Sequence, residues 1–163
     1  MRKDAGFTYL ALLFFVALMG IVLATTGMLW STAQQREKER DLLFIGNEYR
    51  KAIASYYERT PGTVKRYPDN FNDLLKDNRQ LTTTRHLRRL YIDPMTSTPQ
   101  WGAVRAPEGG IRGVYSLSTD APLKRNGFTQ KDETLNGAKN YTEWRFTYEP
   151  PIVATSDSNK TQK

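Results

Sequence analysis

The first feature of the sequence is a long apolar run near its start. Residues 7–30 contain no Asp, Glu, Lys or Arg. As an α-helix that rises about 1.5 Å per residue, this run would measure roughly 36 Å, which is enough to cross a hydrocarbon layer of about 30 Å. The apolar core of a secretory signal peptide is usually about 7 to 15 residues long. The run therefore predicts a membrane-spanning helix over residues 7–30.

At Ser31 the pattern changes from uniformly apolar to amphipathic. Apolar residues now recur at steps of three and four, with Arg, Glu and Lys between them: Leu42, Ile45, Tyr49, Ile53 and Tyr56. The next proline is in Pro61–Gly62, a pair that stops helices. We therefore predict one helix from about residue 8 to about residue 60, roughly 80 Å long, whose second half, 31–60, lies on a globular domain.

A second interpretation of this boundary stays open. The segment "STAQ" at residues 31–34 places small residues at the spacing that signal peptidase recognises. Cleavage after Ala33 would release a soluble protein. The polar segment beyond Ala33 continues the helical pattern without a break, which favours the single long helix.

Short elements follow between residues 61 and 151. In chain order they are a short helix within 67–77, a loop or second short helix within 81–91, and strands over 100–106, 111–118 and 141–149. The sequence "PEGG" predicts a hairpin turn between the first two strands. In the third strand, alternation places Trp144, Phe146 and Tyr148 on one side. Together these patterns predict an α+β fold, in which the long N-terminal helix packs on a small antiparallel sheet. Residues 152–163 predict a flexible tail.

Composition narrows the classes of function. The chain has 163 residues, no cysteine, a formal net charge of +7 and a pI near 9.7. A chain without cysteine has no disulfide framework, no thiolate metal site and no cysteine nucleophile. The positive charge suits a solvated basic face, and also a nucleic acid or an anionic membrane surface. The candidate basic surface lies near Tyr91 and consists of Arg79, Arg85, Arg88 and Arg89.

The residues that catalysis usually requires are scarce. The single histidine, His86, lies in "RHLRR", where neighbouring cations disfavour its protonation. The pair Gly109–Gly110 lacks the strand, helix and lysine of a phosphate-binding loop and predicts a turn. The sequence therefore predicts a protein that is not an enzyme and that has no cofactor and no metal site.

The N-terminus carries the most specific motif. Residues 1–6, "MRKDAG", form a short basic leader that ends at Gly6, and "FTYLALLF" follows it. A leader of this kind before one long, half-apolar helix resembles the type IV pilins and the pseudopilins of type II secretion systems. The resemblance implies that a prepilin peptidase cleaves after Gly6 and methylates the new N-terminal residue, Phe7.

Later segments extend this resemblance to about residue 118. They occur in the order found in the major pseudopilin: "YPDNFNDLLKD", "HLRRLYIDP", "WG" and "GGIRGVYSLS". The resemblance implies a pilin-like fold in a single-pass protein of the bacterial inner membrane with a periplasmic C-terminal domain. It also implies assembly with other pseudopilins through the N-terminal helix, driven by an inner-membrane platform. The alternative within the same family is a minor type IV pilin whose basic surface binds DNA in uptake or adhesion, although nucleic acid is the less favoured partner.

Two positions depart from the family pattern. Ala11 stands where family members usually carry a glutamate that pairs with a neighbour's terminal amine, which predicts a minor or accessory subunit. In the loop after "VYSLS", Asp120 is accompanied by Lys124 and Arg125, whereas a hard dication prefers several oxygen ligands without adjacent cations. No calcium site of the family's usual type is therefore predicted, although Asp132 and Glu133 could supply ligands from further along the chain.

Overall fold

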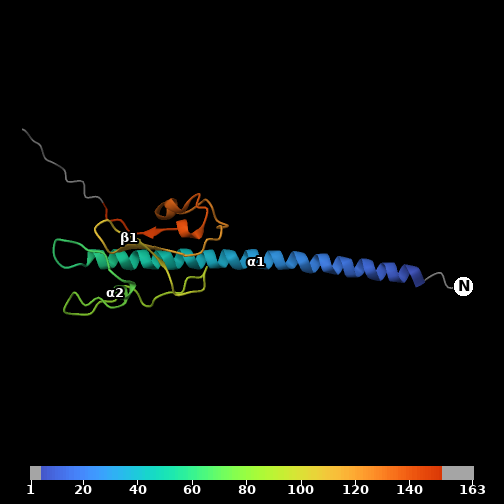
Figure 1. Cartoon of the computed structure of the whole chain (residues 1–163), viewed down its shortest axis with the longest axis horizontal. Coiled ribbons are helices and arrows are strands. Elements are labelled where there is room, and N and C mark those ends of the chain that lie inside the picture. The colour runs from blue at the N-terminus through green and yellow to red at the C-terminus, as the bar shows by residue number, and fades with distance from the viewer. Residues whose placement is uncertain (1–4, 152–163) are drawn as a thin grey trace, which may run out of the picture.

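One helix runs the length of the molecule. The computed structural model describes residues 5–151, and the side chains of residues 7–21 and 30–151 within that range. Helix α1, Ala5–Glu58, is a continuous α-helix of 54 residues. The other elements gather around its C-terminal half, and its N-terminal half extends away from them (Figure 1). The predicted single helix is confirmed, with both ends within a few residues of the expected positions.

The remaining elements are short and form a small antiparallel sheet. They are helix α2 (Phe71–Leu75), strands β1 (Gly102–Arg105), β2 (Ile111–Tyr115) and β3 (Phe146–Thr147), and the 3-10 helices η1 (Gln130–Leu135) and η2 (Tyr141–Glu143). The strand order is β1-β2-β3, with Gly102 paired to Tyr115 in the hairpin. Gly109 and Gly110 turn the hairpin at φ values of 98° and 79°, which side chains disfavour. The fold is therefore α+β, with a long N-terminal helix on a three-stranded sheet.

The third predicted strand is much shorter than expected. Only Phe146 and Thr147 pair with β2, because the preceding residues form η2, in which the backbone N–H of Trp144 donates to the carbonyl of Tyr141. This turn buries the rings of Tyr141 and Trp144, which are three residues apart. In an extended strand, residues three apart point to opposite faces, so both rings could not lie on the same side. The alternation nevertheless identified Trp144 and Phe146 as core residues, since both are fully buried, while Tyr148 is only partly buried.

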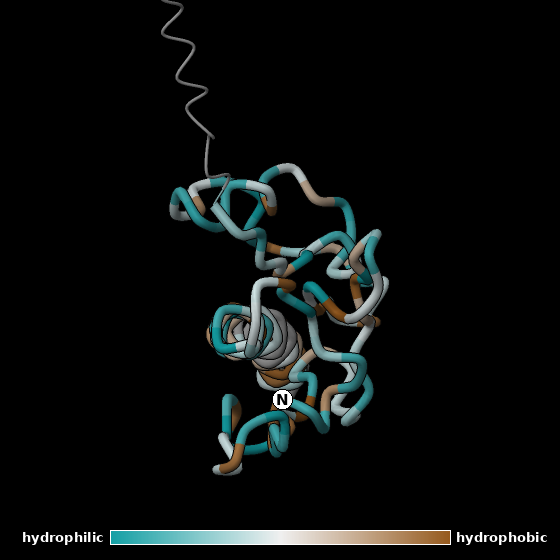
Figure 2. The backbone as a smooth tube through the Cα atoms, turned by 90° about the vertical axis from the view of Figure 1, so that its left-hand side faces the viewer, coloured by the Kyte–Doolittle hydropathy of each residue, from teal (hydrophilic) through white to brown (hydrophobic). Residues whose placement is uncertain are grey.

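The core lies between the amphipathic half of α1 and the elements around it. Four of the five apolar residues expected on the helix stripe are buried, and Ile45 is partly buried. Seen along the helix, the chain curves round α1 and leaves one flank of the helix uncovered (Figure 2). Phe44, a large apolar residue on the C-terminal half of α1, is 60% exposed and lies outside the core.

A glycine sets the distance between α1 and the sheet. Gly46 is buried on the helix, and a Cβ built at this position would overlap the ring of Phe146. Phe146 itself is fully buried in β3. The missing side chain therefore lets an aromatic ring from the sheet lie directly on the helix backbone.

We predict that Gly46→Ala destabilises the protein, although alanine is favoured over glycine inside a helix by about 1 kcal/mol. The added methyl group overlaps the Phe146 ring, and overpacking of this kind costs about 1 to 3 kcal/mol. Gly20→Ala is the matched control, since nothing lies within 4 Å of a Cβ built there. Thermal unfolding should show a lower melting temperature for Gly46→Ala alone. An unchanged melting temperature for that variant would contradict the close packing.

Candidate functional site

The N-terminal half of α1 presents exposed apolar side chains over residues 7–21. Residues 7–21 are all exposed, and the large apolar side chains among them include Phe7, Leu10 and Phe14, which are 78%, 67% and 67% exposed. Scattered apolar residues are normal on a protein surface, but a continuous apolar helix surface is typical of a site that packs against a membrane or a partner. Among the residues whose side chains are described, no helical segment is both long and apolar enough to cross a membrane.

The residues predicted to take part in processing and assembly lie at the start of this helix. Gly6, Phe7 and Ala11 belong to α1, and Phe7 and Ala11 are exposed. Residues four apart in a helix share a face, so Ala11 lies one turn from Phe7. Residues 1–4 of the predicted leader lie outside the described part of the chain.

A buried carboxylate fixes the point at which α1 enters the globular part. Glu39 is 4% exposed, and its Oε1 accepts hydrogen bonds from the backbone N–H of Leu123 at 2.6 Å and of Lys124 at 3.2 Å. The hydroxyl of Tyr141 donates to the same oxygen at 2.9 Å. Burial, together with the hydrogen bond to Glu39, raises the pKa of Tyr141 to about 12, so Tyr141 stays a protonated donor. These contacts anchor the 121–124 loop and η2 to the helix.

A second contact that attaches the globular part to α1 is an ion pair between Arg50 of the helix and Asp132 of η1. Arg50 Nη1 lies 2.7 Å from Asp132 Oδ1, with both side chains largely buried. Thr129 Oγ1 also donates to Asp132 at 3.0 Å. Asp132, which the sequence suggested as a further oxygen ligand, is thus engaged with Arg50, while Glu133 is exposed. Within the described residues there is no group of three or more His, Cys, Asp or Glu placed to hold a metal ion.

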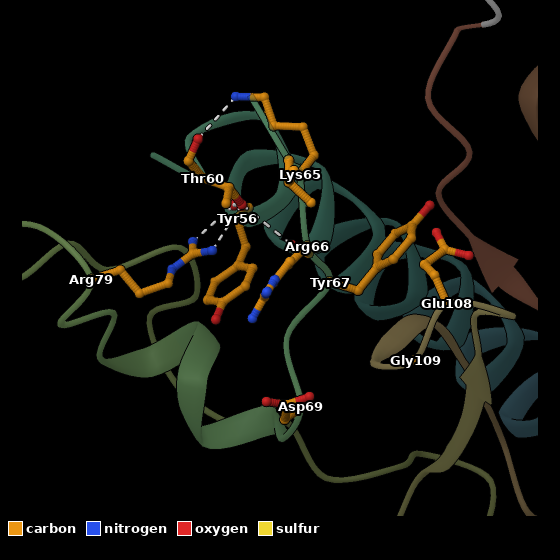
Figure 3. A pocket seen from close by; sticks show the side chains of 10 residues that line it. Tyr56, Thr60, Lys65, Arg66, Tyr67, Asp69, Arg79, Glu108 and Gly109 are labelled. Atoms are coloured by element: carbon orange, nitrogen blue, oxygen red, sulfur yellow. Dashed lines mark hydrogen bonds between the residues drawn. The ribbon is translucent and has the colours of Figure 1, made fainter. Parts of the chain in front are cut away.

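The C-terminal end of α1 is held by a network around Asp77. Arg79 donates from Nε and Nη2 to the two oxygens of Asp77 at 2.8 and 2.7 Å. Its Nη2 also donates to the carbonyl of Tyr56, and its guanidinium lies 3.4 Å from the centroid of that ring (Figure 3). Hydrogen bonds from Arg79 hold the pKa of Asp77 well below its usual range, and His86 contributes in the same direction. Asp77 is therefore a permanent buried anion at neutral pH.

His86 completes this network and shows a geometry that resembles a catalytic triad. Its Nδ1 lies 2.9 Å from Ser55 Oγ and its Nε2 lies 3.1 Å from Asp77 Oδ2. The imidazole is fully buried, however, and Ser55 lies inside α1, where backbone N–H groups bond within the helix and do not form an oxyanion hole. The contacts therefore attach the segment 77–86 to α1.

A hollow of about 500 Å³ lies beside this network (Figure 3). Its wall carries three cations, from Lys65, Arg66 and Arg79, and two carboxylates, from Asp69 and Glu108. Charges of both signs face the same space. The hollow consequently does not select a ligand by charge.

The structure divides the four arginines that were predicted to form a basic surface. Arg79 is partly buried and committed to Asp77, whereas Arg85, Arg88 and Arg89 are exposed. Arg85 and Arg88 line a separate hollow of about 450 Å³ together with Tyr91. Arg89 lies over the Tyr91 ring at 5.2 Å from its centroid. Three of the four therefore share one surface.

Sequence reasoning missed the buried acids. Glu39 lies three residues before Leu42 on the buried stripe of α1, and a charged residue on an apolar helix face is a signal that could have identified it. Asp93 is a second buried acid that the sequence pattern did not identify. It is fully buried, and it accepts hydrogen bonds from the N–H of Met95 at 2.9 Å and from Ser116 Oγ at 2.7 Å. No sequence pattern shows that Ser116, 23 residues away, is its partner.

We predict that Asp77→Asn destabilises the protein by about 3 kcal/mol near pH 7, because it leaves Arg79 partly buried without its counterion. The folded-state pKa of Asp77 is lowered, so its contribution is present above its unfolded pKa of about 3.9 and is lost as the pH falls below that value. The difference in unfolding free energy between the two proteins should therefore shrink from about pH 4 downward. Asp69→Asn, at an exposed position, is the control and should cost little. Denaturant titrations at several pH values test this, and a difference that is as large at pH 2 as at pH 7 would contradict the ion-pair explanation.

Comparison with known proteins adds no further guide to the site. The chain matches no protein-family model, no curated protein and no solved structure. A functional assignment therefore depends on the residues and the geometry described above.

Proposed function

We propose that this chain is a membrane-anchored pseudopilin-like subunit, a structural component of a periplasmic filament of the type II secretion kind. One observation carries the proposal: a single 54-residue helix packs its C-terminal half on a small α+β domain and extends its N-terminal half beyond that domain (Figure 1). The extended half exposes apolar side chains over residues 7–21. This is the arrangement expected of a pilin-like fold. The short basic leader ending at Gly6 supports the same assignment.

The energetics of the apolar half support a location out of water. Burying one large apolar side chain is worth about 1.5 to 3 kcal/mol, and residues 7–21 expose many of them. Residues 7–30 contain no charged residue, and α1 is continuous through them, although the side chains of 22–29 lie outside the described part. Either lipid or the apolar helices of neighbouring subunits would bury this apolar surface.

The proposed mechanism requires no bond chemistry and no cofactor. An inner-membrane platform lifts the subunit, and the apolar half of α1 exchanges lipid for the helices of other pseudopilins. The ties at Glu39, Arg50 and Asp77 distribute the load along the helix, because they join it to the periplasmic domain at its entry, in its middle and near its end. A rigid connection of this kind lets a pull on the helix move the whole domain.

We predict that the mature chain begins at Phe7 and carries one N-methyl group. Coexpression with a prepilin peptidase, followed by intact-mass measurement of the membrane fraction, tests this. Gly6→Leu should retain the leader, because the peptidase requires glycine at that position, whereas Ala5→Leu is the neighbouring control and should be processed. A mature terminus at Gln34 would establish the signal-peptide interpretation instead and would overturn the membrane-anchored proposal.

We also predict that the chain is an accessory subunit present in few copies. Ala11 lacks the carboxylate that family members use to meet a neighbour's terminal amine, although the amine of its own Phe7 stays available to a glutamate of another subunit. Ala11→Glu should increase incorporation into filaments, and Ala11→Gln, of similar size without the charge, should not. Quantitative mass spectrometry of sheared filaments gives the copy number. If this chain is the most abundant subunit, the accessory role is wrong.

A further inference from the structure

The exposed segment around Arg85, Arg88 and Arg89 has a fixed backbone. The N–H groups of His86 and Leu87 both donate to the carbonyl of Leu74, at 2.9 and 2.8 Å. The side chain of His86 is fully buried, and Leu87 is 3% exposed. The arginines on either side of these two anchors are therefore presented from a rigid support. We call residues 85–92 the arginine ridge.

The guanidinium groups on this ridge are available to a ligand. Within the described residues, Arg85 and Arg88 form no hydrogen bond and no ion pair, and both line the hollow of about 450 Å³. Arg89 lies over the ring face of Tyr91. A guanidinium offers a planar fork of donors that matches a carboxylate or a phosphate. Because the guanidinium groups of Arg85 and Arg88 line the same hollow, an anionic ligand would fit there.

The neighbouring side chains favour protein over nucleic acid. Leu90 and Ile92 on the same ridge are 39% and 61% exposed, and they offer apolar contacts that a phosphate backbone does not use. Arginine and tyrosine beside apolar residues are typical of the centre of protein interfaces.

We propose that the arginine ridge is a docking site for an acidic, apolar segment of another protein. In this arrangement, carboxylates of the partner bind Arg85 and Arg88, and an apolar or aromatic side chain packs on Tyr91 and Ile92. The site is independent of the proposed pilin-like role, because it lies on the globular part and does not involve the N-terminal half of α1.

The test uses the full chain in detergent micelles and three fluorescent probes. These are a random copolymer of glutamate and tyrosine, polyglutamate of the same length, and a single-stranded oligothymidine. The ridge variant is R85A/R88A. The control variant, R105A/R145A, removes two exposed arginines elsewhere and so has the same net charge. Melting temperatures of both variants should equal that of the unmodified protein.

We expect the copolymer to bind more tightly than polyglutamate or oligothymidine. R85A/R88A should weaken copolymer binding by about tenfold or more, and R105A/R145A by about twofold at most, since tenfold corresponds to the loss of one good interaction. R85K/R88K keeps the charge without the fork and should lie between these values. The proposal is overturned if the copolymer does not bind, if both double alanine variants lose affinity equally, or if polyglutamate binds as well as the copolymer. Tighter oligothymidine binding that depends on Arg85 and Arg88 would assign the ridge to nucleic acid instead.

Discussion

The contact between the C-terminal half of α1 and the sheet is the interaction on which the rest of the fold depends. The strands are only two to five residues long, and a sheet of that size is marginal without a helix to cover it. Gly46 lets the ring of Phe146 lie on the helix backbone, and Trp144 is buried in the same core cluster. A shorter or fully polar helix would leave the Phe146 ring without this apolar contact.

Buried charges then decide where each loop attaches. Apolar packing is not directional and would tolerate small shifts of the loops along the helix, whereas hydrogen-bonded carboxylates would not. Glu39 accepts hydrogen bonds from the backbone of the 123–124 segment, and Asp132 forms an ion pair with Arg50. Asp77 forms an ion pair with Arg79, which in turn donates to the last turns of α1. Because an unpaired buried charge is costly, these three acids specify one arrangement of long and otherwise irregular connections.

The two halves of α1 suit two different environments, and the division between them follows from their side chains. The C-terminal half has one apolar stripe and polar residues elsewhere, which suits a surface helix of a domain. The N-terminal half is apolar all round over 7–21, which suits burial on every side. The arginine ridge lies on the globular part, so a partner bound there would meet the domain and not the apolar half of the helix.

The sequence by itself determined the elements whose signals are local. Uncharged and amphipathic runs without proline identified α1, and "PEGG" identified the hairpin turn, because periodicity and turn chemistry depend on neighbouring residues. Only the tertiary structure decided that 141–144 turns as a 3-10 helix, that Arg79 belongs to Asp77 and not to the basic surface, and that Glu39 and Asp93 are buried acids. Their partners are far away in sequence, as with Glu39 and Tyr141. The free energy of a buried hydrogen bond depends on which distant groups meet, and a one-dimensional pattern does not contain that information.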